Sequence, residues 1–335
     1  MKPNKKLITI SNNESQIKQL LHDLVLSPRL KALEWSAITK QTPNMKIGYP
    51  GQHLASLVLG MEGERTGARG NDIIDGSEVK SCSRVDQLDS CNDCGEKILR
   101  MEKCCPQCLS TKIKRMDDSK WLFTVRNEND ISVLLDDVDR VVLCIADYPN
   151  FKNDDFEDIR FQVFEIWTKS VRNKHFRKII REYYDKIYSV HKTKNSAKTP
   201  APCNFWPFSH QFYMCNPIKV FECTVENANN KDATIHISSY IKPDEDRTYI
   251  ASELMPTILL TAEELITLLT KAAKNVITPH LAKGGTYEDL KAELVKKKIS
   301  IKNIAQILPF ITEEMREYIP LRPPKDIKEL GKYRR

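Results

Sequence analysis

Two pairs of cysteines restrict the folding of this chain more than any other feature of its sequence. Cys91-Asn-Asp-Cys94 and Cys105-Pro-Gln-Cys108 each have CxxC spacing, and ten residues separate the pairs. Each pair can form a tight knuckle whose two thiolates point at one ion, and two knuckles complete a tetrahedral four-sulfur site. Because four sulfurs leave no open coordination position, we expect a structural Zn²⁺ ion held by all four in a small ribbon.

The other cysteines do not suggest a disulfide framework. Four of the ten are scattered, and we expect them to be buried as small apolar side chains: Cys144, Cys203, Cys215 and Cys223. Cys104 adjoins the second pair and could substitute for one of its members, although it would break the CxxC spacing. The N-terminus offers only a very short apolar stretch and no export signal. Clustered cysteines without such a signal favour a metal site in a reducing compartment, so we expect a cytoplasmic protein.

Composition limits the class of protein further. A chain of 335 residues that is 41% hydrophobic and 29% charged is typical of a globular protein with more than one domain. The longest uninterrupted apolar run, residues 141–146, is far shorter than the roughly 18 residues of a membrane-spanning helix. The net charge of +7 suits a polyanionic partner without requiring one. We therefore expect no membrane partner.

Hydrophobic periodicity predicts how the chain is organised. We expect an N-terminal helical region at 1–50, a core at 51–257 that contains the ribbon at about 89–112, and a helical C-terminal region at 258–335. Helices are predicted at 16–26, 51–59, 169–190, 261–276, 287–297 and 301–308. Strands are predicted at 77–82, 121–125, 141–146, 160–167, 218–225 and 233–241.

A glycine-rich stretch introduces a second group of chemically active residues. Gly63, Gly67, Gly70 and Gly76 fall within fourteen residues, although the whole chain has only eleven glycines. Such a concentration indicates backbone that bends or closely approaches another group. We expect one strand to end at Ile73, a turn to follow, and a second strand to begin directly after Gly76.

This predicted hairpin brings acidic residues together. With a three-residue loop, Gly76 takes the left-handed conformation and Asp72 lies opposite Glu78, with Lys80 two residues further along the same face. Carboxylates are hard oxygen ligands suited to Mg²⁺, and Lys80 can orient or help deprotonate a metal-bound water. A two-residue loop would turn Asp72 to the other face and make Asp75 the candidate. A surface hairpin with an ordinary ion pair is the non-catalytic alternative.

These residues resemble a known nuclease motif. Asp72 followed by Glu78-Val79-Lys80 resembles the D…(D/E)xK motif of the PD-(D/E)xK superfamily. The longer stretch 67–95, GARGNDIIDGSEVKSCSRVDQLDSCNDCG, resembles type II restriction endonucleases of the MamI kind, and the likeness covers roughly residues 50–170. Asn71 stands where a proline usually precedes the first aspartate, and the aspartate-to-glutamate separation is short. The choice between Asp72 and Asp75 therefore stays open.

The resemblance implies a fold, a reaction and a partner. It implies a mixed α/β fold with a PD-(D/E)xK restriction-endonuclease-like core, in which helices flank a central mixed sheet and the zinc ribbon is an insertion. It also implies catalytic Mg²⁺ bound by Asp72 and Glu78, assistance from Lys80, and a further carboxylate after the preceding helix, Glu62 or else Glu64. The expected reaction is hydrolysis of double-stranded DNA at a palindromic or interrupted palindromic site by a homodimer, whose symmetry mirrors that of the site.

Two other functions remain compatible with the sequence. One is a DNA repair or recombination nuclease of the same fold, and the other is a non-catalytic zinc-ribbon protein that binds nucleic acid. The sequence contains no GxxxxGK[ST] phosphate loop, so we expect no nucleotide cofactor. Basic stretches at 97–115, 169–181 and 191–198 are candidate DNA contacts, although exposed basic residues are most often only solvated.

Overall fold

The chain forms two compact units. A computed structural model describes residues 1–43, 46–65 and 71–324. Unit 1 comprises Met1–Trp121, Asp137–Glu165 and Lys219–Thr248, and unit 2 comprises Leu122–Asp136, Ile166–Ile218 and the chain from Tyr249 onward. Each unit is therefore assembled from three separate segments. These units are defined by contacts, and the three regions expected from the sequence remain a prediction.

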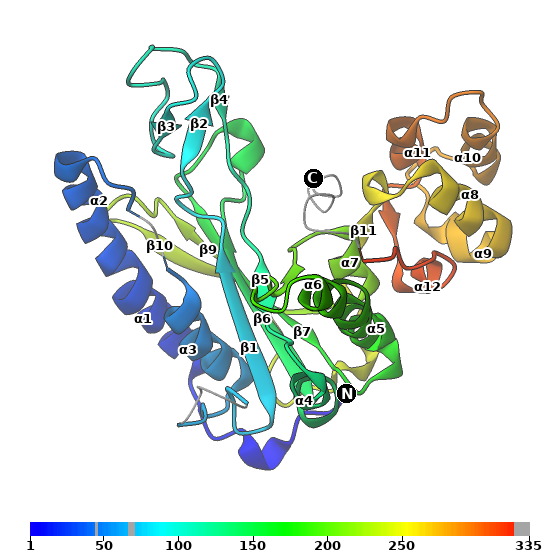
Figure 1. The fold of residues 1–335 in the computed structure, drawn as a ribbon, viewed down its shortest axis with the longest axis horizontal. Coiled ribbons are helices and arrows are strands. Elements are labelled where there is room, and N and C mark those ends of the chain that lie inside the picture. Colours follow the sequence, from blue (N-terminus) through cyan, green and yellow to red (C-terminus); the bar gives the residue numbers. More distant parts are fainter. Residues whose placement is uncertain (44–45, 66–70, 325–335) are drawn as a thin grey trace. The chain divides into compact units, whose positions relative to one another are not determined.

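A five-stranded sheet forms the centre of unit 1 (Figure 1). Its strands, in spatial order, are β1 (Ser77–Ser83), β6 (Arg140–Asp147), β7 (Ile159–Ile166), β9 (Ile218–Glu226) and β10 (Thr234–Tyr240). β1 pairs with β6 in parallel, whereas β9 and β10 are antiparallel, so the sheet is mixed as predicted. Every residue of β6 is buried, as expected for a strand covered on both faces.

The N-terminal segment contains three α-helices, which are α1 (Asn13–Leu21), α2 (Ser27–Thr39) and α3 (Gly48–Leu59). Figure 1 shows α3 next to β1. α3 contacts α1, β1 and β6. Its buried face includes Leu54, Ala55 and Val58, at the spacing of one helical face. Gly51 lies where α3 comes closest to β1, because a Cβ atom there would be only 2.8 Å from Ser81 Cβ. The helix is thus seated directly against the strand that carries Glu78 and Lys80.

A buried ion pair fixes α2 to the rest of unit 1. Arg29 pairs with Asp86, and both side chains are almost wholly buried. The Tyr148 hydroxyl donates a hydrogen bond to Asp86 at 2.8 Å. Burial raises the pKa of Tyr148, and the neighbouring Asp86 carboxylate raises it further. Tyr148 therefore stays a neutral donor, and the buried Asp86 charge is matched by both a cation and a hydrogen bond.

A small ribbon is inserted after β1, as predicted. It contains β2 (Asp89–Cys91), β3 (Lys97–Ile98) and β4 (Ile113–Lys114), in the antiparallel order β3-β2-β4. At its base, the buried Asp89 carboxylate is paired with Arg100 and Arg115, each at 2.8 Å. The Arg100 guanidinium also lies over the rings of Phe151 and Phe156, at 5.0 and 5.2 Å. These contacts anchor the ribbon to the segment that follows β6.

Unit 2 is mainly helical. Its described helices are α4 (Glu128–Ser132), α5 (Lys174–Tyr183), α6 (Ser189–Lys194), α7 (His210–Met214), α8 (Ala262–Lys271), α9 (Lys274–Ile277), α10 (Tyr287–Leu294), α11 (Ile301–Ile307) and α12 (Glu313–Arg316). Short strands pair as β5 (Trp121–Phe123) with β8 (Cys203–Phe205), and as β11 (Met255–Pro256) with β12 (Phe310–Ile311). Thr261 and Thr286 each begin a helix with a capping box. Among the described residues, no helix has both the length and the apolar character to span a bilayer.

Replacing Gly51 with alanine should lower the free energy of unfolding by about 1–3 kcal/mol, because the added methyl group overpacks the contact between α3 and β1. Gly48→Ala is the matched control in the same helix, since nothing lies within 4 Å of the position its Cβ would occupy. Urea denaturation of both variants measures the difference. Equal stability of the two variants would contradict the close approach of helix and strand.

Candidate active site and metal cluster

The residues before β1 form a tight turn rather than the predicted hairpin. The Gly76 N–H donates to the Ile73 carbonyl at 3.0 Å, and Gly76 has a φ of +86°, the left-handed conformation that was expected. Within the described residues, however, no strand ends at Ile73, which forms only an isolated bridge with Gly63. The hairpin expectation was wrong because the N–H groups of Asp72 and Ile73 both donate to the Ser77 carbonyl, at 2.9 and 3.1 Å, which closes the turn without a second strand. From Ser77 onward β1 pairs with β6 instead. Gly67 and Gly70 lie outside the described residues.

The turn nevertheless brings the three predicted catalytic side chains together. Asp72 accepts a hydrogen bond from the Val79 N–H at 2.7 Å and another from Gln52 Nε2 at 3.0 Å. Glu78 and Lys80 form an ion pair, with only 18% and 27% of their side chains exposed. Two carboxylates and one ammonium therefore share a half-buried patch at the start of β1.

Glu78 carries a perturbed acid group. Burial raises its pKa, the Lys80 ammonium opposes that rise, and the adjacent Asp72 carboxylate adds to it. Burial has the largest effect, so ionised Glu78 is less stable in the folded protein than in water. A divalent cation at this patch would be favourable, because it would offset the repulsion between the two carboxylates.

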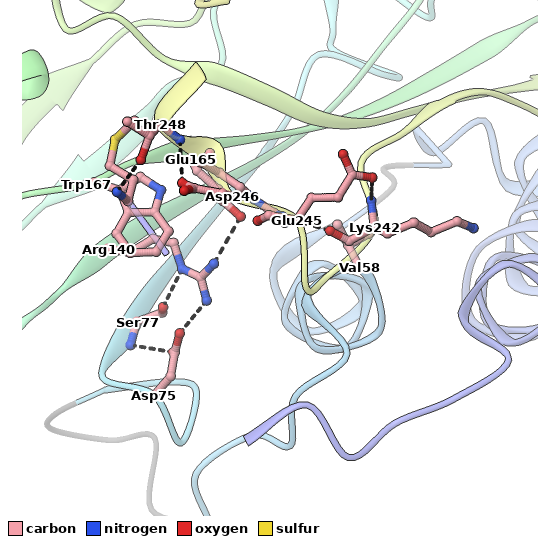
Figure 2. A network of polar contacts seen from close by, with 12 residues as sticks. Val58, Asp75, Ser77, Arg140, Glu165, Trp167, Lys242, Glu245, Asp246 and Thr248 are labelled. Carbon is pink, nitrogen blue, oxygen red and sulfur yellow. Dashed lines mark hydrogen bonds and ion pairs between the residues drawn. The ribbon is translucent and has the colours of Figure 1, made fainter. Parts of the chain in front are cut away.

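Asp75 is engaged elsewhere. Its carboxylate accepts a hydrogen bond from the Ser77 N–H at 3.1 Å and is paired with Arg140. Arg140 is buried at the start of β6, and it also donates to Ser77 Oγ at 2.9 Å and to Glu165 at 3.0 Å. Figure 2 shows the Arg140 guanidinium between these partners. Of the two aspartates left open by the sequence, Asp72 is the one placed beside Glu78.

A cleft of about 480 Å³ opens next to Asp72. Its lining residues come from α3 and from the segments on either side of the turn: Tyr49, Gln52, His53, Ser56, Gly63, Glu64, Arg65 and Asp72. Glu64 is part of this wall, whereas the Glu62 carboxylate accepts a hydrogen bond from Thr9 Oγ1 at 3.4 Å. Gln52 was not predicted as a site residue. Its position directly after Gly51, on the helix that precedes the glycine-rich stretch, was the available signal.

The four cysteines of the two CxxC pairs form one cluster. Their sulfur atoms all lie within 4.8 Å of one another, whereas Cys104 is exposed and is not a member. Backbone N–H groups of Cys94 and Asp93 lower the pKa of Cys91 to about 7, against the opposing effect of burial. The Glu96 N–H acts to lower the pKa of Cys94, but burial and hydrogen bonds with the other cysteines raise it to about 12. The arrangement of the four sulfurs could hold a metal ion in a closed tetrahedral site.

The two knuckles share one backbone geometry. In each knuckle, the N–H of the first cysteine donates to the carbonyl of the residue five positions later. The N–H of the residue four positions later donates to the carbonyl of that cysteine, and all four bonds are 2.8–3.0 Å long. The residue that makes the returning bond has a positive φ, which is +78° at Gly95 and +59° at Leu109. A left-handed conformation costs a non-glycine residue about 1–2 kcal/mol. The first knuckle therefore has glycine at this position, whereas the second knuckle has leucine.

The basic stretch 169–181 is largely paired within unit 2. Its arginines each meet an acidic residue: Arg172 with Glu313, Arg177 with Asp136, and Arg181 with Glu128. Exposed ion pairs of this kind contribute little stability, but they occupy the charges that were candidates for contact with DNA.

Comparison with known proteins gives two matches. A family model described as MamI restriction endonuclease matches residues 34–258. The Type II restriction enzyme MamI of Microbacterium ammoniaphilum is 36% identical over 73 residues, which are 22% of this chain and 24% of that protein. The aligned region thus spans about a quarter of the length of this relative. No solved structure matches the chain.

Without divalent cations, Glu78→Gln should raise the thermal unfolding midpoint at about pH 8. The pKa of Glu78 is higher in the folded protein than in the unfolded chain. The contribution of Glu78 to the stability of the fold is therefore complete below its pKa in the unfolded chain. It is lost as the pH rises through its pKa in the folded protein. Glutamine mimics the protonated acid, so the difference in unfolding midpoint between the variant and the original protein should disappear near pH 4.

Glu222→Gln is the opposite-sign control for this measurement. Although burial acts to raise the pKa of Glu222, Lys219 and Gln162 lower it overall. This substitution should therefore lower the midpoint at about pH 8. A Glu78→Gln protein that is less stable than the original at that pH would show that burial does not dominate at Glu78.

Proposed function

We propose that this chain, which belongs to the MamI restriction endonuclease family, is a Mg²⁺-dependent type II endonuclease that cuts double-stranded DNA at a specific site. The observation that carries the proposal is the convergence of Asp72, Glu78 and Lys80 beside an open cleft. The palindromic or interrupted palindromic site and the homodimer expected from the sequence are part of the same proposal, because a two-fold symmetric protein can read a two-fold symmetric sequence.

The residues at the patch fit a magnesium ion. Asp72 and Glu78 would bind Mg²⁺ through carboxylate oxygens, and the ion when bound would offset negative charge at the scissile phosphate. Gln52 orients Asp72 from α3. Lys80 opposes the rise in the pKa of Glu78 and would provide a cationic donor for the phosphate or the attacking water. Glu64, which lines the cleft, is better placed than Glu62 to add a third carboxylate.

The family resemblance and the geometry support cleavage more than the two other functions. A non-catalytic ribbon protein would not need two adjacent half-buried carboxylates, whose mutual repulsion costs stability. A repair or recombination nuclease would use the same patch, and it is distinguished by the DNA it cuts. The fragment pattern is therefore the decisive observation.

Incubation of the purified chain with phage-length DNA should give discrete, reproducible fragments with Mg²⁺ and intact DNA with EDTA. Glu78→Ala and Lys80→Ala should each reduce cutting by at least about 10³-fold while DNA binding changes little, because each removes a group that acts on the reacting phosphate. Gel electrophoresis of the products and a filter-binding assay measure the two effects.

Glu222→Ala is the matched control for these variants. Lys219 and Glu222 form an ion pair on the same sheet at 2.9 Å, with side chains 26% and 21% exposed, but they lie on β9 rather than β1. This variant should cut normally. Full activity of Glu78→Ala would overturn the site, a smear of products would favour a non-specific nuclease, and intact DNA with Mg²⁺ would favour the non-catalytic protein.

We also propose that the cysteine cluster holds structural Zn²⁺. Tetrahedral zinc with Zn–S bonds of about 2.3 Å separates its sulfurs by about 3.8 Å. Two of the sulfur–sulfur distances here are 3.6 Å, for Cys91 with Cys108, and 3.5 Å, for Cys94 with Cys105. The ligand type and the spacing of the sulfurs therefore both fit zinc.

Cys105→Ser should lose the zinc ion and destabilise the ribbon, since it removes one of four ligands from a closed site. Elemental analysis of the purified protein should give one zinc per chain in the original and little in the variant. Cys104→Ser is the neighbouring control and should keep its zinc, because Cys104 is exposed and outside the cluster. Zinc loss in Cys104→Ser with retention in Cys105→Ser would reverse the assignment.

A further inference from the structure

Leu109 combines two unfavourable features at one position of the ribbon. Its φ of +59° is in the left-handed region, where glycine is normally preferred. Its side chain is also 75% exposed, although it is large and apolar. Gly95 makes the equivalent bond in the other knuckle with no side chain at all. The stability of the ribbon alone would therefore favour glycine at both positions.

Leu109 shares the ribbon with a second exposed apolar residue and with lysines. Met101 is 49% exposed. Lys97, Lys103 and Lys114 are exposed and make no ion pair within the part of the chain that the structure describes. Exposed cations on a duplex-binding protein contact phosphates. Apolar side chains such as leucine and methionine are the ones that proteins insert between base steps in the minor groove, with lysine or arginine contacts beside them.

We propose that Leu109 is an apolar wedge that contacts the bases of duplex DNA in the minor groove, while the ribbon lysines contact the phosphates. This inference rests on the proposed function, because it takes duplex DNA as the partner. That contact would explain both the strained backbone and the exposed side chain of Leu109, because the side chain would be buried only when DNA is bound. The ribbon thus contributes to binding the substrate as well as to the fold.

The wedge would act at a distance from the reacting phosphate. Glu78 and Lys80 lie near the start of β1, and the ribbon follows the end of this strand. From Glu78 to the end of β1 at Ser83 the strand spans roughly 16 Å, which corresponds to about five base pairs along a duplex. Loss of the wedge should therefore weaken DNA binding without changing the rate of the chemical step in the bound complex.

Leu109→Gly separates binding from folding, because it should not harm the fold. With the full-length, zinc-containing chain, the variant should keep its zinc and unfold at the same or a higher temperature. Its affinity for a duplex fragment that the original protein cuts, measured without Mg²⁺, should fall about tenfold. Single-turnover cleavage at saturating protein should be unchanged.

Two more substitutions at this position test the chemistry of the contact. Leu109→Met keeps a flexible apolar side chain and should bind DNA within about twofold of the original. Leu109→Asn tolerates the left-handed backbone but is polar, so it should bind as weakly as Leu109→Gly. Lys103→Gln should weaken DNA binding. It should also reduce the slope of log affinity against log salt concentration by about one, as expected for the loss of one phosphate contact.

The outcomes distinguish this inference from the proposed function. If the original protein neither binds nor cuts duplex DNA, the proposed function fails. If it cuts, and Leu109→Gly binds the same fragment with equal affinity, only the wedge is overturned. A Leu109→Met protein that binds DNA as weakly as Leu109→Gly would also overturn the wedge, because the loss of affinity would then not come from the loss of an apolar contact.

Discussion

The buried Arg140 guanidinium holds together the parts of unit 1 on which the candidate site depends. It connects the start of β6 to Glu165 on β7, to Asp75 in the turn before β1 and to Ser77 at the start of β1. Arg247 lies 3.4 Å from the second oxygen of Glu165, so two buried cations face two carboxylates. Breaking such a network by removing one partner typically costs about 3–5 kcal/mol, because an unpaired charge is left in the interior. The turn owes its position to this network.

The candidate site and the ribbon each contain a residue that lowers the stability of the fold. Glu78 is buried beside a second carboxylate, which raises its pKa, and the ribbon holds Leu109 in a left-handed conformation. The rest of unit 1 offsets these costs, since β6 is buried along its whole length and α3 packs tightly through Gly51. Local unfavourable choices supported by a well-packed core are a common sign of functional positions.

The sequence predicted local features well and long-range pairing poorly. The four-cysteine cluster follows from spacing alone, and Gly76 followed by a strand is a local pattern, so both were predictable. The parallel partner of β1 was not, because β6 begins more than sixty residues further along, at Arg140, and nothing in the turn encodes that distance. The engagement of Asp75 by Arg140 depends on the same long-range pairing. This is why the sequence left two aspartates open and why a hairpin was expected.

The division of unit 1 into three segments has a consequence for its biosynthesis. Its sheet includes β9 and β10, and its segments extend to Thr248. A ribosome adds about 5–20 residues per second, so a chain that has reached only Glu165 must wait for its last two strands and for Arg247. Until then β7 has an open edge, which favours association with other chains over folding. The candidate site lies before residue 81, but the sheet that supports it is complete only when β10 has been made, at residues 234–240.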